Sequence, residues 1–192
     1  MSEYLASQRK DAHLDLAKQT LADRARTPHP LDSIELPYCA LPELDLPQID
    51  ITARFLGHQL AAPMLITGMT GGTARADRLN AALVSVAARH KIAIGLGSQR
   101  ASLEAGHSQH ALRKAHPTAC LIGNLGGGQI IGKAGLALAE RAAGDIDADA
   151  LAIHLNPLQE AIQPEGDHNW QGVEEAIMRL VDKLACPIIV KE

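Results

Sequence analysis

Short apolar runs alternate with amphipathic segments from residue 63 onward, and this alternation restricts the fold more than any other feature. The apolar runs occupy 64–67, 91–96, 119–122, 150–155 and 187–191. The amphipathic stretches between them cover 74–90, 107–116, 130–143 and 172–185. This order predicts strands joined by right-handed helical crossovers, and therefore a parallel sheet.

Composition and charge narrow the class of protein. Hydrophobic residues make up 46% of the 192 residues but aromatic ones only 2%, so we expect a core of Ala, Leu, Ile and Val, as in buried parallel sheets. The net charge of -4 gives no reason to expect nucleic acid or an anionic membrane as a partner. Cys39, Cys120 and Cys186 are widely spaced and indicate reduced thiols. We expect a cytoplasmic protein.

The first third of the chain has a different character. Residues 3–22 are predicted to form a helix, and four prolines between 31 and 63 break the chain into extended pieces such as 33–36 and 51–56. We therefore predict a lead-in over 1–62, packed against a strand-and-helix domain over 63–192.

Five strands fit either a doubly wound open sheet or part of a barrel. Polar residues follow every predicted strand, which is the pattern of a (β/α)8 TIM-type barrel. We predict such a barrel with about the first five βα units present. Because the last strand runs to the end of the sequence, we interpret the chain as part of a longer protein.

The segments after the first two strands carry candidate binding groups. The turn Met69-Thr70-Gly71-Gly72 lets backbone N–H groups approach a flat ring or an anion, although a plain βα turn explains it too. The segment Gly97-Ser98-Gln99-Arg100 offers a hydroxyl, an amide and a guanidinium suited to phosphate, and a solvated loop is the alternative. Asn124 follows the third strand and is similarly ambiguous.

The segment from His154 to Glu160 carries the strongest signal. His154 and Asn156 share one face as the fourth strand ends. Pro157 stops the strand, and Gln159 and Glu160 follow in the turn, although a capped turn without a ligand explains these residues too. Glu160 is a plausible Mg²⁺ ligand because hard cations prefer oxygen donors. Lys191, at the end of the last strand, is a candidate to face an anion or a flavin, whereas Arg9 and Lys10 fit a solvated helix face on sequence alone.

These segments together resemble the type 2, FMN-dependent isopentenyl diphosphate isomerases. The resemblance runs through nearly the whole chain, including Arg9 to Leu14, Pro63 to Gly72, Gly97 to Arg100, His154 to Glu160, Gln163 to Asp167 and Pro187 to Glu192. It implies interconversion of isopentenyl and dimethylallyl diphosphate by a 1,3-allylic proton shift. It also implies reduced FMN, Mg²⁺, NADPH as reductant, no nucleic-acid or membrane partner, and a homo-oligomeric intact protein.

The resemblance also assigns roles by position. His154 and Gln159 would be catalytic residues, with Glu160 as the metal ligand. The substrate would be bound by Arg9, Lys10, Ser98, Gln99, Arg100, Asn156 and Gln159. The FMN would be contacted by Thr67, Gly68, Met69, Thr70, Gly71, Gly72, Ser98, Asn124 and Lys191.

Two other functions fit the same sequence. One is an FMN-dependent 2-hydroxy acid oxidase or dehydrogenase, and the other is a non-catalytic half-barrel without the cofactor's phosphate site. In barrels the loops after strands seven and eight usually hold that phosphate. We therefore expect this chain alone to bind FMN weakly or not at all and to lack isomerase activity.

Overall fold

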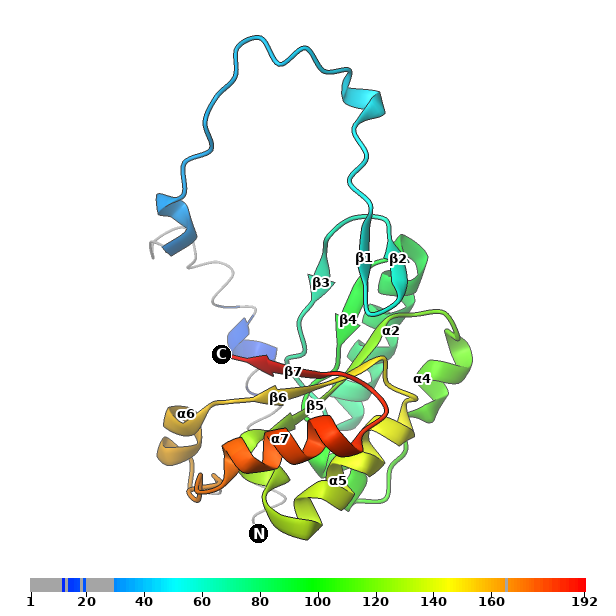
Figure 1. Cartoon of the computed structure of the whole chain (residues 1–192). Coiled ribbons are helices and arrows are strands. Elements are labelled where there is room, and N and C mark those ends of the chain that lie inside the picture. The colour runs from blue at the N-terminus through cyan, green and yellow to red at the C-terminus, as the bar shows by residue number, and fades with distance from the viewer. Residues whose placement is uncertain (1–11, 13, 18, 20–29, 165) are drawn as a thin grey trace.

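The computed structural model describes residues 12, 14–17, 19, 30–164 and 166–192. Five parallel strands form one sheet, in the order in which they occur along the chain. They are β3 (Leu65–Ile66), β4 (Ala93–Gly95), β5 (Leu121–Gly126), β6 (Ala150–His154) and β7 (Ile188–Lys191). Each strand pairs with the next in parallel, so their carboxyl ends meet at a single edge of the sheet (Figure 1).

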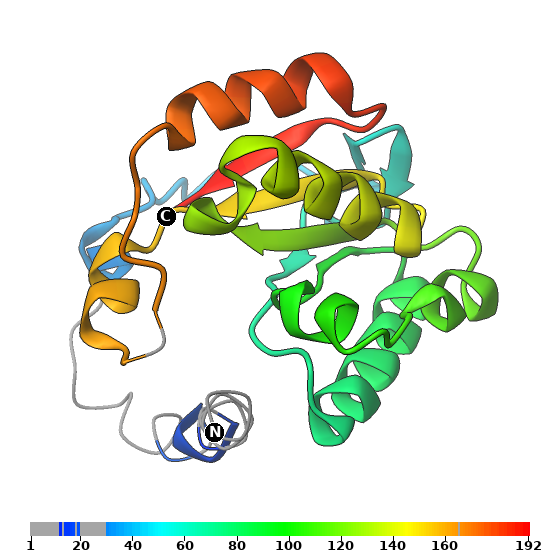
Figure 2. The ribbon, with the colours of Figure 1, turned by 90° about the horizontal axis from the view of Figure 1, so that it is seen from below.

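Helices cover one face of this sheet. They are α2 (Ala74–His90), α3 (Arg100–Glu104), α4 (His110–Ala115), α5 (Gly132–Asp145) and α7 (Val173–Lys183), with α6 (Pro157–Ile162) beyond β6. The buried core between sheet and helices contains Leu121, Leu125 and Ile153 from the strands. Figure 2 shows α7, in orange and red, beside α5, in yellow-green.

Among the described residues, an antiparallel hairpin of β1 (Ala53–Phe55) and β2 (His58–Leu60) covers the opposite face, at the amino ends of the strands. Phe55 and Leu56 pack against the alternate strand residues Cys120, Ile122 and neighbouring alanines. The carboxyl half of this face carries Asn124, His154 and Lys191, because these positions alternate with the residues that point to the helices.

Sequence features explain where the helices lie. Thr73 caps α2, since its hydroxyl accepts a 3.1 Å hydrogen bond from the amide of Ala76. The buried residues of α2, Ala76, Asn80, Val84 and Ala87, recur at the spacing of one helix face. The predictions for 74–90, 130–143 and 172–185 agree with α2, α5 and α7 within two residues at each end.

The predicted (β/α)8 barrel is wrong, and so is the doubly wound alternative. The described sheet has five strands, β3 and β7 are open edges, and the helices lie on one face. The barrel prediction depended on polar residues after every strand. An open parallel sheet gives the same pattern, because its carboxyl ends also share one edge, and closure needs about eight strands.

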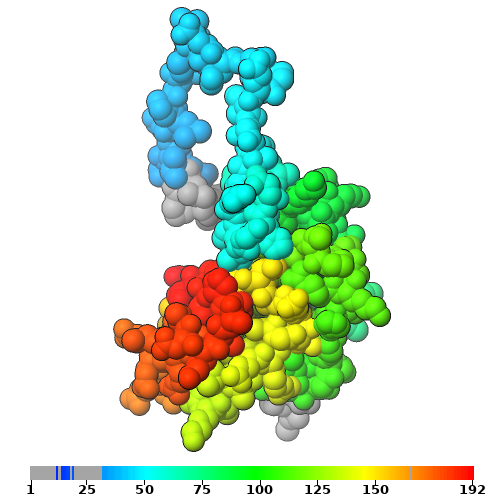
Figure 3. Space-filling model, turned by 45° about the vertical axis from the view of Figure 1, so that its right-hand side comes forward, coloured from blue at the N-terminus to red at the C-terminus, as the bar shows by residue number. Residues whose placement is uncertain are grey.

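The lead-in also differs from its prediction. Residues 32–52 form an arm that stands away from the sheet, with 3₁₀ turns η2 (Pro30–Ser33) and η3 (Leu46–Gln48) (Figures 1 and 3). Its side chains are exposed, including Leu36, Tyr38 and Leu46. Within the predicted helix over 3–22, residues 12, 14–17 and 19 are helical and the others lie outside the described residues.

The hairpin turn depends on a left-handed pair of residues. Leu56 and Gly57 have φ of 48° and 80°, the combination that a two-residue type I′ turn requires. Replacing Gly57 with Ala is expected to cost about 1 kcal/mol of unfolding free energy, since nothing lies within 4 Å of the added Cβ and only the backbone conformation is penalised. Urea unfolding measures this change. Gly57→Asn is the matched variant, because Asn tolerates this conformation; an equal loss in both variants would contradict the argument.

An ion-pair cluster joins the hairpin to the sheet. The imidazole Nε2 of His58 lies 2.7 Å from Oδ1 of Asp149, just before β6. Asp149 Oδ2 accepts hydrogen bonds from Arg113 at 2.9 Å and from the Leu121 amide at 2.8 Å. Burial acts to raise the pKa of Asp149, but the hydrogen bonds from His58, Leu121 and Arg113 outweigh it and hold that pKa below its usual value.

Cys120, beside this cluster, gives the fold an alkaline limit. Burial, with a contribution from the Asp149 charge, raises the pKa of its thiol to about 11 from 9.0. Between these values the unfolded chain loses the proton while the folded chain keeps it, so the free energy of unfolding falls as pH rises, by up to about 1.4 kcal/mol per pH unit. Chemical unfolding between pH 8 and pH 11 measures the slope. Cys120→Ala should flatten it and Cys39→Ala should not, because Cys39 is exposed; equal slopes in the two variants would exclude Cys120 as the cause.

Candidate functional site

The candidate site lies at the carboxyl edge of the sheet, on the face that the helices leave uncovered. His154 and Lys191 are direct partners in the register of β6 and β7, and Asn124 is opposite Ala152 on the neighbouring strand. All three side chains are therefore on the same face within neighbouring strands. The arrangement brings a cation, an imidazole and an amide together, as the sequence predicted for strand ends.

Two glycines bring the loops after β3 and β4 into backbone contact. A Cβ on Gly68 would lie 1.9 Å from the Leu96 carbonyl oxygen, and one on Gly97 would lie 2.0 Å from that of Thr70. The buried Asn80 of α2 donates a 3.1 Å hydrogen bond to the same Thr70 carbonyl. Only glycine permits this approach, so the two segments that the sequence singled out lie against each other.

Gln99 has a different position from the one predicted. Its side chain is 1% exposed, its Nε2 donates to the carbonyl of Ala142 in α5, and its Oε1 accepts from the backbone amide of Asn124. The Asn124 side chain in turn donates to the Leu96 carbonyl at 2.9 Å. Both amides therefore connect the loop after β4 to strand β5. Both polar side-chain atoms of Gln99 already have protein partners and are not offered to a substrate.

Arg100 and Glu160 are linked through a residue to which the sequence gave no role. Asp167 accepts a 2.8 Å hydrogen bond from Nη1 of Arg100 and one of 3.3 Å from Gln129, while its backbone amide donates to Oε2 of Glu160 at 2.9 Å. Glu160 Oε1 accepts from Nδ2 of Asn156 at 2.8 Å. Asp167 thus positions both the predicted phosphate-binding cation and the predicted metal ligand.

Several buried polar atoms at this edge lack hydrogen bonds to any described residue. They are Thr70 Oγ1, Asn124 Oδ1, Asn156 Oδ1 and His154 Nε2. His154 Nε2 does lie 2.9 Å from the Glu192 carboxylate, at a geometry that makes an ion contact but no hydrogen bond. Buried polar atoms without partners are costly, so these groups favour a polar ligand.

The charge of Lys191 also favours a polar ligand at this site. Burial lowers the pKa of this half-buried ammonium, and the neighbouring Glu192 carboxylate raises it in part. A bound anion near Lys191 would favour its charged form and oppose the cost of burial. The site is therefore suited to a negatively charged ligand.

Other predicted residues stand apart from this group or lie outside it. Gln159 is exposed on α6, Thr67 and Met69 are exposed after β3, and Ser98 is half-buried after β4. Arg9 and Lys10 lie outside the described residues. Among the described residues, Glu160 does not belong to any group of three or more His, Cys, Asp or Glu side chains close enough to hold one metal ion.

Asp167 and Gln129 are the site residues that sequence reasoning missed. Asp167 belongs to the segment 163–167 that the resemblance includes, but nothing in the segment indicates an arginine as partner. Its contacts join residues 67 and 38 positions away, across three loops. The only local indication of a functional residue in this segment is a carboxylate directly after Gly166.

Fold and site together define a parallel α/β protein with a candidate anion-binding site at the carboxyl ends of its strands. No family model matches the sequence. The chain is similar to proteins named isopentenyl-diphosphate delta-isomerase, from Xanthobacter autotrophicus (46% identical), Vibrio parahaemolyticus (44%) and Halobacterium salinarum (45%). The alignments cover 100%, 96% and 96% of this chain but 57%, 55% and 52% of those relatives. The chain thus spans little more than half the length of the relatives it matches.

The resemblance to the type 2 family needs correction. The relatives' names give the isomerase without a type, and an open five-stranded sheet stands in place of the (β/α)8 barrel that the narrower assignment implied. What stands is similarity to isopentenyl-diphosphate delta-isomerases. None of the described helices combines the length and the apolar character that crossing a bilayer requires.

Proposed function

We propose that this chain contributes the diphosphate-binding part of an isopentenyl-diphosphate delta-isomerase. The observation that carries the proposal is the position of Arg100 and Lys191 at the carboxyl edge of the sheet, beside polar atoms without described partners. The sequence similarity to the named isomerases over the whole chain also supports the proposal.

The chemistry assigns binding, rather than proton transfer, to most of these residues. The Arg100 guanidinium has donors beyond the Nη1 that bonds to Asp167, and its planar fork suits diphosphate oxygens. Lys191 adds a second positive charge, and His154 and Asn156 offer polar atoms at the ends of the site. Fixing the diphosphate would hold the allylic carbons in one place, which is how positioning lowers the barrier of a proton shift.

Mg²⁺ is the metal that this proposal includes. Diphosphate oxygens bind Mg²⁺ in many sites together with one or two carboxylates. Glu160 and Asp167 are neighbouring carboxylates here, although both oxygens of Glu160 already accept hydrogen bonds. A second lone pair on each oxygen leaves room for a metal ion.

FMN and its reductant NADPH stay predictions, because the relatives' names do not mention either. The residues present fit a flat ring that forms hydrogen bonds: the loops that meet at Gly68 and Gly97 leave main-chain groups close together, and Thr70 and Asn124 offer unpaired oxygens. Reduced flavin would supply a proton carrier when bound. Flavin fluorescence titration tests this step by itself. A cytoplasmic location and a homo-oligomeric state also stay predictions.

Two measurements on the 192-residue chain test the proposal. Calorimetric titration with isopentenyl diphosphate and Mg²⁺ is expected to show binding that isopentenol, which lacks the diphosphate, does not reproduce. Exchange of substrate protons in D₂O, followed by NMR, then tests isomerisation with and without reduced FMN. Equal affinity for isopentenol, or no binding at all, would contradict the proposal.

A further inference from the structure

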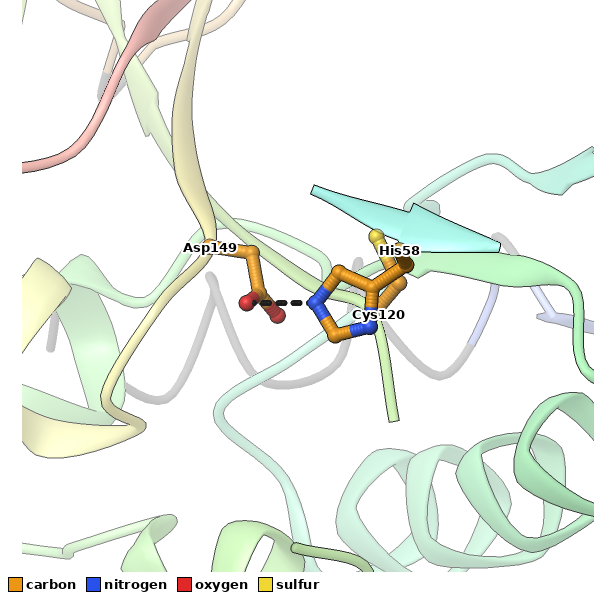
Figure 4. A group of neighbouring side chains, drawn as sticks. All are labelled: His58, Cys120 and Asp149. Atoms are coloured by element: carbon orange, nitrogen blue, oxygen red, sulfur yellow. Dashed lines mark hydrogen bonds and ion pairs between the residues drawn. The ribbon is translucent and has the colours of Figure 1, made fainter. Parts of the chain in front are cut away.

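A second group of side chains, unrelated to the candidate site, lies at the opposite edge of the sheet. His58 comes from β2, Cys120 immediately precedes β5, and Asp149 immediately precedes β6. The ligand atoms of the three, one nitrogen, one sulfur and one oxygen, lie within 4.8 Å of one another. Figure 4 shows the imidazole pointing at the Asp149 carboxylate with Cys120 beside it.

The hydrogen bonds of these three side chains leave one potential metal-ligand atom of each near the other two. Asp149 Oδ2 is held by Arg113 and by the Leu121 amide, so the oxygen that faces His58 is Oδ1, at 2.7 Å from Nε2. Cys120 is 2% exposed, whereas His58 and Asp149 are half-buried. An ion would therefore reach the cluster from the hairpin side and find the carboxylate already oriented.

We propose that His58, Cys120 and Asp149 bind one divalent transition-metal ion, of which Zn²⁺ is the best match. Thiolate, imidazole and a single carboxylate oxygen are the ligands that Zn²⁺ takes, and a sulfur ligand disfavours Mg²⁺ and Ca²⁺. Three protein ligands leave a fourth tetrahedral position for water. The Arg113 guanidinium binds the other carboxylate oxygen and positions Asp149, as outer partners of metal ligands do.

Binding has a defined proton balance. The Cys120 thiol, with its pKa raised to about 11, is protonated at neutral pH and must release one proton to become a ligand. The neutral imidazole keeps its proton on the ring nitrogen that does not bind the ion. The ion therefore replaces the contact between His58 and Asp149, and no oxidant or reductant takes part.

A bound ion would have a structural effect on the attachment of the hairpin to the sheet. An ion at this place would hold the β1–β2 hairpin to the starts of β5 and β6, which the hairpin now contacts through apolar packing and the hydrogen bond between His58 and Asp149. The three ligands come from segments that are 62 and 29 positions apart in sequence, so the ion closes long loops. This inference does not depend on the proposed isomerase function.

Titration with Co²⁺ tests the inference on the whole chain. A bound cysteine thiolate gives Co²⁺ a charge-transfer band in the near ultraviolet, and one equivalent is expected to saturate it. The double variant Cys39→Ser/Cys186→Ser keeps Cys120 as its single thiol and should retain the band. Cys120→Ser should lose it, and His58→Ala should weaken Co²⁺ binding by at least about tenfold.

Thermal unfolding gives a second readout that needs no cysteine change. Zn²⁺ should raise the melting temperature of the unchanged chain, and His58→Ala should abolish this rise. A band that persists in Cys120→Ser would place the ion on Cys39 or Cys186 and overturn the proposal. So would the absence of any band in the double variant, or a rise in melting temperature with Zn²⁺ that persists in His58→Ala.

Discussion

Gly97→Ala is expected to destabilise the fold by about 3 kcal/mol or more. The added Cβ would lie 2.0, 2.2 and 2.6 Å from the oxygen, carbon and nitrogen of Thr70. All three are backbone atoms, so no side-chain rotation relieves the overlap, and the loops after β3 and β4 must separate. Asn80 would then lose the Thr70 carbonyl as its partner.

Gly144→Ala is the matched control for this substitution. Gly144 is in α5, and nothing lies within 4 Å of the Cβ that alanine would add. Alanine should therefore stabilise the helix by up to about 1 kcal/mol. Urea unfolding compares the two variants. If Gly97→Ala stays within about 0.5 kcal/mol of the unchanged chain, the close approach of the two loops is not what fixes the site.

The sequence predicts the helices and strands well because they depend on local pattern. The helix over 74–90 follows from apolar spacing and the capping Thr73, and its bounds match α2. The sequence pattern ends this strand at residue 122, because Gly123 and Asn124 have low strand propensity. In the structure, pairing with β6 extends β5 to Gly126. Tertiary pairing outweighs propensity at that point.

Two short helices were missed for different physical reasons. Pro157 was interpreted as the end of a strand, but it begins α6, because proline is tolerated in the first turn of a helix. The five residues of α3 are too few to show a helical period, and they depend on contacts such as the Gln99 amide network. Neither feature has a local signal that distinguishes it from a loop.

The sequence indicates which strand-end side chains lie near one another, but not how the residues of the loops pair. His154, Asn124 and Lys191 lie together because strand ends in a parallel sheet share an edge, and that rule needs only the strand positions. The burial of Gln99 under α5 and the ion pair of Arg100 with Asp167 depend on how loops fold over one another. Loop contacts across tens of residues are not encoded in a local pattern.

Arg100→Gln is expected to weaken binding of isopentenyl diphosphate with Mg²⁺ by about ten- to hundredfold. The estimate follows from about 1.5–3 kcal/mol for a hydrogen bond to a charged group. Calorimetric titration of the chain measures the loss. The result distinguishes a site built around this guanidinium from non-specific attraction, which the net charge of -4 does not favour.

Arg179→Gln removes the same charge from an unrelated surface, since the described partner of Arg179 is Glu175 on the same helix. Its affinity should stay within about twofold of the unchanged chain, because exposed charges at a distance are screened. A similar loss in Arg100→Gln and Arg179→Gln would mean that only overall charge matters, and a tighter complex with Arg100→Gln would exclude the guanidinium from the binding site.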